Sequence, residues 1–207
     1  MSASRVIEVL VEERSAAAFL EGVLPRVLPP QTRFKVRSFE GKHDLLQSLP
    51  SRLAGYAARR RDGEDVRVLL LVDRDNDDCQ DLKRRLVSHA MTAGLTSGAA
   101  EPGAVLVARI AVAELEAWYF GDWAAARRAF TKLPAATPAA WRNPEHASGK
   151  PSHYFQSALR RAGYTGEVEK SKPTWGRKMG VLVDVRANRC PSFVAFVDGV
   201  RHLAVAQ

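Results

Sequence analysis

Three nearly continuous apolar segments constrain the fold of this 207-residue chain more than any other feature. They cover residues 6–11, 66–72 and 104–112, and they are rich in valine, isoleucine and leucine. Strands that are apolar along their whole length, rather than at alternate positions, are typical of a parallel sheet that is covered on both faces. A weaker strand is expected over residues 34–39. We therefore expect an α/β fold with a mostly parallel sheet.

Amphipathic helical patterns alternate with these strands. They cover residues 15–28, 43–61, 78–93 and 114–130. Pro50 lies inside the second pattern, and it predicts that this helix is split or bent. A regular alternation of strands and helices is typical of a doubly wound unit with right-handed crossovers.

The last two-fifths of the chain differ from the rest in charge and composition. Residues 1–122 contain 17 basic and 18 acidic residues, whereas residues 123–207 contain 14 basic and 5 acidic ones. The net charge of +8 therefore belongs to the second part. A proline-rich stretch over residues 133–150 predicts a long ordered loop or lid. Short helices are expected over residues 152–162, 178–187 and 192–204. We expect an α/β core over residues 1–122 and a basic, mainly helical C-terminal extension over residues 123–207, packed on the core.

Acidic residues follow each of the three apolar strands. They are Glu12 and Glu13, then Asp73 and Asp75, then Glu114 and Glu116. The carboxyl ends of parallel strands lie at one edge of a sheet, where binding sites form. Carboxylates gathered there repel one another unless a cation neutralises them, and their oxygens suit Mg²⁺ or Mn²⁺. Such an ion polarises phosphoryl oxygens and activates water, so the pattern predicts chemistry on phosphate.

Acids that directly follow a strand also serve as helix N-caps or first-turn charges. This structural role is expected for Asp77, Asp78 and Asp81. For Glu13 both roles stay open. If a helix has begun by residue 114, Glu114 and Glu116 diverge, and at most one of them faces the site.

Several classes of protein do not fit the sequence. The apolar runs are too short to span a membrane, and the N-terminus lacks the features of a secretory signal. The two cysteines, Cys79 and Cys190, cannot form a disulfide framework or a zinc site alone, and the five histidines show no ligand spacing. The absence of a glycine-rich phosphate loop argues against a nucleotide triphosphatase. We expect a cytoplasmic protein without membrane contact, in which Trp118, Tyr119 and Trp123 belong to the core.

Two strand ends carry a resemblance to a known family. A strand that ends in Glu, followed by one that ends in Asp-x-Asp, resembles the Toprim domain of topoisomerases, primases and overcoming-lysogenization-defect nucleases. More narrowly, the chain resembles the bacterial Toprim-like family called domain of unknown function 4276. The matching stretches are residues 11–20, LLLVDRDNDDCQDLKRRL at 69–86, RIAVAELEAWYFGD at 109–122 and CPSFVAFVDGV at 190–200.

This resemblance implies a fold and a set of functional residues. The fold would be a Toprim-like three-layer sandwich. Glu12, Asp73 and Asp75 would bind Mg²⁺ or Mn²⁺. Glu114 and Glu116 would serve a second metal site, with Glu116 as a ligand, and all five acids would be catalytic. A late lysine supports the phosphate in related nucleases, and Lys150 and Lys172 are the candidates here.

The resemblance also implies a function. The chain would be a divalent-metal-dependent nuclease that hydrolyses DNA or RNA, the effector of an antiphage defence module with a separate ATPase. The basic extension would grip the nucleic-acid backbone. Related sequences have Gly after the first Glu and an acid four positions after it, where this chain has Glu13 and Ala16, so one or two metals stay open. The alternative is a non-catalytic module that binds a partner ATPase or nucleic acid. A phosphoacceptor domain would need a lysine after a last parallel strand, and none is clearly placed.

Overall fold

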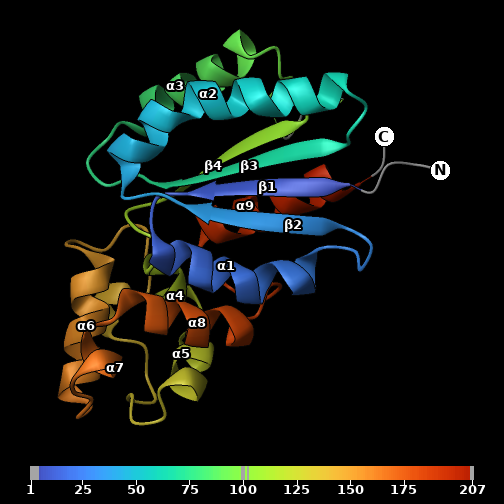
Figure 1. Cartoon of the computed structure of the whole chain (residues 1–207). Helices are drawn as coiled ribbons and strands as arrows, with labels where there is room; N and C mark the ends of the chain where they lie inside the picture. Colours follow the sequence, from blue (N-terminus) through green and yellow to red (C-terminus); the bar gives the residue numbers. More distant parts are fainter. Residues whose placement is uncertain (1–4, 99–100, 102, 206–207) are drawn as a thin grey trace.

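The computed structural model describes residues 5–98, 101 and 103–205, and its centre is a four-stranded sheet (Figure 1). The strands are β1 (Val6–Val11), β2 (Arg33–Ser38), β3 (Val66–Asp73) and β4 (Leu106–Ala111). They lie in the order β2-β1-β3-β4, and every neighbouring pair is parallel. The predicted α/β fold with a parallel sheet is thus confirmed.

Helices cover both faces of the sheet and make a three-layer sandwich (Figure 1). They are α1 (Arg14–Val27) and α9 (Pro191–Ala204) on one face, and α2 (Lys42–Arg61) and α3 (Cys79–Thr92) on the other. Because side chains alternate along a strand, β3 sends Val68 and Leu70 toward α2 and α3, and Leu69 toward α1 and α9. Burial on both faces explains why β3 is apolar at nearly every position.

The segment expected as one helix over residues 114–130 forms two short helices instead. These are α4 (Ala117–Gly121) and α5 (Trp123–Ala129). Asp122 separates them, because its side chain accepts a hydrogen bond from the Ala125 N–H at 2.9 Å and caps α5.

The predicted interruption at Pro50 does not split α2, which runs without a break from Lys42 to Arg61. Proline removes one backbone hydrogen bond from a helix interior. Leucines along one side of α2 are buried against the sheet. We attribute the continuity of the helix to this burial.

The C-terminal extension is mainly helical, as expected. Besides α5 and α9, which also lie within residues 123–207, it contains α6 (Pro151–Arg161), α7 (Glu167–Lys170) and α8 (Lys172–Leu182). A short 3₁₀ helix at Ala139–Trp141 lies inside the proline-rich loop. Helix α8 begins at Lys172 rather than at residue 178, and α7 was not expected from the sequence. Across the ranges that the structure describes, no helix is both long and apolar enough to cross a membrane.

One apolar cluster joins the extension to the sheet. The ring of Phe19 on α1 lies 5.8 Å from the rings of both Trp118 and Tyr119 on α4. Trp118 in turn lies 5.1 Å from Phe193 on α9, and all four rings are buried. Trp123 is buried as well, so these aromatic residues form core, as expected, and not an exposed surface for base stacking.

Helices α1 and α8 touch through their backbones, because glycines face the contact. A Cβ atom on Gly176 would collide with the carbonyl oxygen of Ser15, and one on Gly180 with the carbonyl oxygen of Phe19. Arg26 on α1 adds a polar link by donating a hydrogen bond to the carbonyl oxygen of Val183 at 2.6 Å. This close contact fixes where α8 begins relative to the start of α1.

We expect Gly180→Ala to lower the free energy of unfolding by roughly 1–3 kcal/mol, because the new methyl group must push two backbones apart. Urea denaturation followed by circular dichroism measures the change. Gly55→Ala is the matched control, since Gly55 is an exposed helix-interior residue with no atom near its missing Cβ. That substitution is expected to raise stability by roughly 0.5–1 kcal/mol. Equal effects of the two substitutions would refute the close packing.

Candidate functional site

The acids lie at the point of the sheet where the connections diverge. From β1 the chain passes through α1 to β2, whereas from β3 it passes through α3, on the other face, to β4 on the opposite side. In open parallel sheets, ligands bind at this switch point, outside the carboxyl ends of the strands. Glu12 directly follows β1 and Asp73 ends the neighbouring β3. The convergence of acids expected from the sequence is therefore present.

Hydrogen bonds tie the three strand ends together. Glu12 Oε1 accepts from the Asp73 N–H at 2.9 Å, and Asp73 Oδ1 accepts from the Leu115 N–H at 2.9 Å. Within the described part of the chain, the second oxygen of each carboxylate makes no hydrogen bond. Each acid is thus held by one oxygen and keeps the other for a ligand.

Asp75 lies at the mouth of the site and is held by a lysine. The Lys42 ammonium, at the start of α2, donates to Asp75 Oδ2 at 2.9 Å and to Asp77 Oδ2 at 2.8 Å. Asp77 therefore forms an ion pair and does not cap the helix, which corrects the sequence expectation. Asp78 caps α3 by accepting from the N–H groups of Gln80 and Asp81, and Asp81 lies in the first turn, as expected.

Glu114 and Glu116 both lie near the site. Helix α4 begins only at Ala117, so the divergence expected for a helix that has begun by residue 114 does not apply. Glu114 Oε2 accepts from the Ser152 N–H at 2.9 Å and so anchors the first turn of α6. Glu116 is only 1% exposed and lies beneath the site, beside Glu12 and Asp73.

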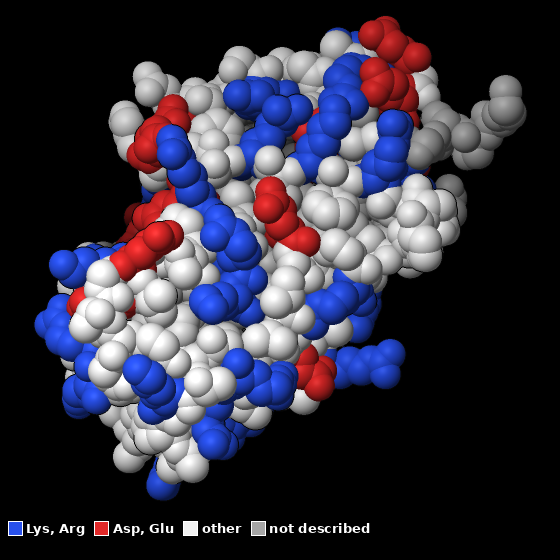
Figure 2. Space-filling view, turned by 60° about the horizontal axis from the view of Figure 1, so that its bottom comes forward, with Lys and Arg blue, Asp and Glu red and all other residues white. Residues whose placement is uncertain are grey.

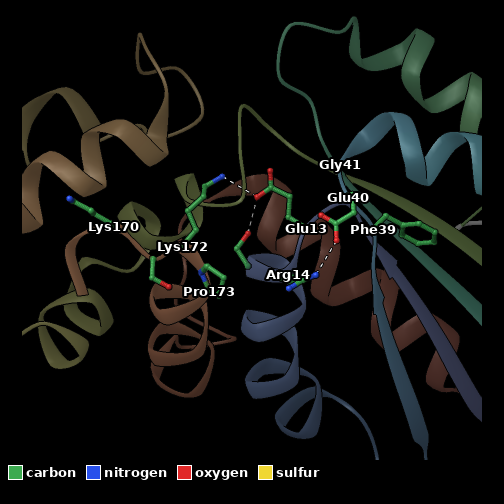
Figure 3. A pocket seen from close by; sticks show the side chains of 10 residues that line it. Glu13, Arg14, Phe39, Glu40, Gly41, Lys170, Lys172 and Pro173 are labelled. Atoms are coloured by element: carbon green, nitrogen blue, oxygen red, sulfur yellow. Dashed lines mark hydrogen bonds and ion pairs between the residues drawn. The ribbon is translucent and has the colours of Figure 1, made fainter. Parts of the chain in front are cut away.

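The Lys172 side chain reaches from the start of α8 into this group of acids. Its ammonium pairs with Glu13 (Figure 3), 3.3 Å from Oε2, and lies 3.4 Å from Glu116 Oε1. Glu13 stands at the N-cap position of α1 but caps no backbone N–H; its Oε2 accepts from the Ser15 hydroxyl at 3.1 Å and pairs with the lysine. From the sequence, Lys172 was only one of two candidates for the lysine that supports the phosphate. Lys42, which follows the end of β2 and begins α2, was not singled out from the sequence.

Acids from the strand ends and residues of the extension line a pocket of about 350 Å³, which we call the acidic pocket. One wall consists of acids from the strand ends: Glu12, Glu13, Asp73, Asp75 and Glu114. The other wall comes from the extension and includes Lys150, His153, Gln156, Lys170 and Lys172. The surface that carries the extension is rich in Lys and Arg (Figure 2). The basic extension thus lies over the acidic edge of the sheet.

Burial and mutual repulsion raise the pKa values of the acids. Burial raises the pKa of Glu12 to about 7, against the opposing charge of Lys42. Burial, followed by the charges of Glu116 and Glu12, raises the pKa of Asp73 well above its usual range. Burial raises the pKa of Glu116 to about 7, against Lys172. Burial lowers the pKa of Lys172, but Glu116 and Glu13 outweigh this effect and raise it above its ordinary value. The site therefore favours additional positive charge.

The donors in the acidic pocket match the chemistry of a hard divalent cation. Beneath the pocket, Glu116 Oε1 is buried and makes no hydrogen bond in the described residues, although the Lys172 ammonium lies 3.4 Å away. Carboxylate oxygens of Glu12 and Asp73 that make no hydrogen bond lie nearby. Oxygens of this kind are what Mg²⁺ and Mn²⁺ bind. Among the residues described, however, no three His, Cys, Asp or Glu side chains already form a metal-binding group. An ion would require Asp75 to exchange Lys42 for the metal.

The raised pKa values make the metal-free protein less stable as the pH increases. Between about pH 4.5 and 7 the folded state keeps protons on carboxyls such as Glu12 that the unfolded chain has released, so folding loses free energy across this window. We expect the melting temperature in EDTA to fall between about pH 4.5 and 7. The Glu12 contribution is on the order of 3 kcal/mol.

Glu12→Gln should reduce this decline, because the amide keeps an oxygen for the Asp73 N–H but does not titrate. Glu21→Gln, at an exposed position of α1, is the control and should leave the decline unchanged. Scanning calorimetry at several pH values measures both. A pH profile that Glu12→Gln does not alter would contradict the electrostatic argument.

Comparison with known proteins identifies the family but no activity. The model of a family described as a domain of unknown function (DUF4276) matches residues 11–201. Searches of curated proteins and of solved structures gave no significant match. The relation to Toprim domains is not confirmed by these comparisons. Since the family match runs from the end of β1 into α9, the chain belongs to the family of domain of unknown function 4276.

Proposed function

We propose that this chain is a divalent-metal-dependent phosphodiesterase that acts on DNA or RNA. One observation carries the proposal: a wall of carboxylates from the strand ends faces a wall of lysines from the extension across one pocket. Carboxylates hold a cation, and lysines attract the phosphate that the cation is to activate. A phosphodiester would contact both walls, because its phosphate binds the cation held by the carboxylates and is also attracted by the lysines.

In this proposal, Glu12, Asp73 and Asp75 hold Mg²⁺ or Mn²⁺. The ion supplies polarisation of a phosphoryl oxygen and a lowered pKa for bound water. Lys172 stays protonated at neutral pH, so it offers a fixed positive charge to the phosphate while it neutralises Glu13 and Glu116. Lys150 approaches the phosphate from the start of α6.

The reaction is a hydrolysis. The oxygen of a water molecule forms a bond to phosphorus while the bond from phosphorus to one sugar oxygen breaks. The attacking water gives up one proton to a pocket carboxylate such as Glu114, whose second oxygen is free of the Ser152 bond. The departing sugar oxygen takes up a proton from solvent, and one water is consumed for each bond cut.

Asp75 and Asp77 provide a matched test of the metal site. Lys42 holds both at nearly the same distance, but only Asp75 lines the acidic pocket. We expect Asp75→Asn to weaken Mn²⁺ binding at least about tenfold, and Asp77→Asn to change it little. Titration calorimetry with Mn²⁺ measures both affinities. Equal affinities of the two variants would contradict the assignment of Asp75 as a ligand.

Cleavage itself is tested by incubating the purified protein with plasmid DNA, single-stranded DNA and RNA in Mg²⁺ or Mn²⁺. We expect cleavage that Asp73→Asn abolishes. We further propose that the chain is the effector of an antiphage defence module, so the assay is repeated with the ATPase of such a module. Failure to cleave with either metal, with and without the ATPase, would refute the nuclease proposal. Cleavage that survives in Asp73→Asn would indicate a contaminating enzyme.

A second candidate is a non-catalytic module that binds a partner ATPase or nucleic acid. The two lysines favour it, because Lys42 and Lys172 already neutralise acids in the pocket. Ala16 favours it too, since it stands where related sequences carry an acid. This candidate predicts no calorimetric signal and no rise in melting temperature with Mg²⁺ or Mn²⁺.

A further inference from the structure

We infer that the acidic pocket is the middle of a continuous groove that holds a nucleic-acid strand on both sides of the reacting phosphate. The bond that is cut would then lie inside the strand and not at its end. This inference rests on the proposed action on nucleic acid, and it specifies the form of the substrate.

Two further hollows adjoin the acidic pocket. The first, which we call the Arg74 hollow, has a volume of about 550 Å³ and shares Asp75, Glu114 and Lys150 with the acidic pocket. The second, the Arg14 hollow, has a volume of about 450 Å³ and shares Glu13, Lys170 and Lys172 with it. Because each hollow shares its border residues with the acidic pocket, the three form one groove along the carboxyl edge of the sheet.

The Arg74 hollow carries positive charge that the protein does not use internally. Within the described ranges, the side chains of Arg74 and Lys150 form no hydrogen bond or ion pair, although both line this hollow. A neutral or apolar ligand would offer no opposite charge to these two side chains, whereas phosphate oxygens would form ion pairs with them. The hollow is therefore suited to a phosphate next to the one in the acidic pocket.

Backbone strain is concentrated at the same border. Asp75 and Ala113 have φ values of 49° and 64°, and they are the only non-glycine residues with positive φ in the part of the chain that the structure describes. The Asp75 N–H donates to the Ala113 carbonyl oxygen at 3.0 Å, so the two turns support each other. Strain of this kind persists where the surrounding structure imposes it, and it is common at binding sites. Here it shapes the passage between the acidic pocket and the Arg74 hollow.

The Arg14 hollow offers a second cationic end. Figure 3 shows the Arg14 guanidinium beside Glu40, to which it donates at 3.1 Å. Both side chains are largely exposed, at 77% and 80%, and an exposed pair of this kind contributes little free energy. A phosphate can therefore replace Glu40. Lys172 stands at the border of this hollow, so basic side chains extend from Arg14 to the acidic pocket, with Glu13 and Glu40 among them.

The order of charges along the groove favours an internal strand. Arg74 and Arg14 stand at the two ends, and the acids that would hold a metal ion line the middle together with lysines. A mononucleotide or a terminal phosphate would occupy the middle and leave at least one end unused. A strand that passes through would place one phosphate in each hollow and gain the free energy of every contact.

The test is metal-free binding of a fluorescent oligothymidylate of about 20 nucleotides, measured by anisotropy in EDTA. We expect Arg74→Ala/Lys150→Ala and Arg14→Ala each to weaken binding roughly tenfold, and each to reduce the salt dependence by about 0.7 per lost phosphate contact. Arg33→Ala/Lys35→Ala is the control, because these exposed residues lie on β2, with Arg33 at its opposite end. It should change affinity less than about twofold.

Competitors decide whether the groove is open at both ends. A circular single strand should compete as well as a linear one, whereas thymidine monophosphate should not compete. The inference is overturned if the circular strand fails to compete, if only one end of the groove affects affinity, or if the control weakens binding as much as the groove variants. Since binding is measured without metal, the result does not depend on cleavage. If the groove binds the strand but no cleavage occurs, the proposed nuclease activity is refuted and the proposed binding groove still stands.

Discussion

The backbone contact between α1 and α8 is the interaction on which the rest of the site depends. Gly176 and Gly180 let the two helices approach so closely that a Cβ atom at either position would collide with a backbone carbonyl oxygen of α1. As a result the start of α8 stands beside the start of α1, and Lys172 reaches Glu13 and the buried Glu116. The basic extension is thereby part of the site, since it supplies the wall that faces the acids.

Charge balance in this pocket follows from that geometry. Glu12, Asp73 and Glu116 are buried together, and their pKa values rise because each carboxylate loses water and faces other acids. Lys42 and Lys172 neutralise part of this negative charge by pairing with Asp75 and Glu116, but they do not neutralise all of it. A divalent ion would neutralise the rest, and a phosphate would then meet the lysines. The net charge of +8 is therefore best understood through its distribution: the acids gather at the strand ends and the bases lie over them.

Local sequence was enough to predict the sheet and its acidic edge. Continuous apolar strands require a covered parallel sheet, and parallel strands place Glu12, Asp73 and Glu114 at one edge whatever the rest of the chain does. The position of the extension was not predictable in this way, because it depends on long-range packing of α8 on α1. The spacing of Gly176 and Gly180, four residues apart on one helix face, was the available signal. Lys42 was missed because a lone lysine at a helix start has no distinguishing pattern. The role of Asp77 was then misjudged, because its partner is this lysine.

A crystal structure with Mn²⁺ would test whether the acidic pocket holds a divalent cation. Crystals soaked in Mn²⁺ would be measured at a wavelength where manganese scatters anomalously. We expect an anomalous peak between the carboxylates of Glu12, Asp73 and Asp75, with Asp75 turned away from Lys42. A pocket without such a peak, in which Asp75 still pairs with Lys42, would contradict the proposed cation site.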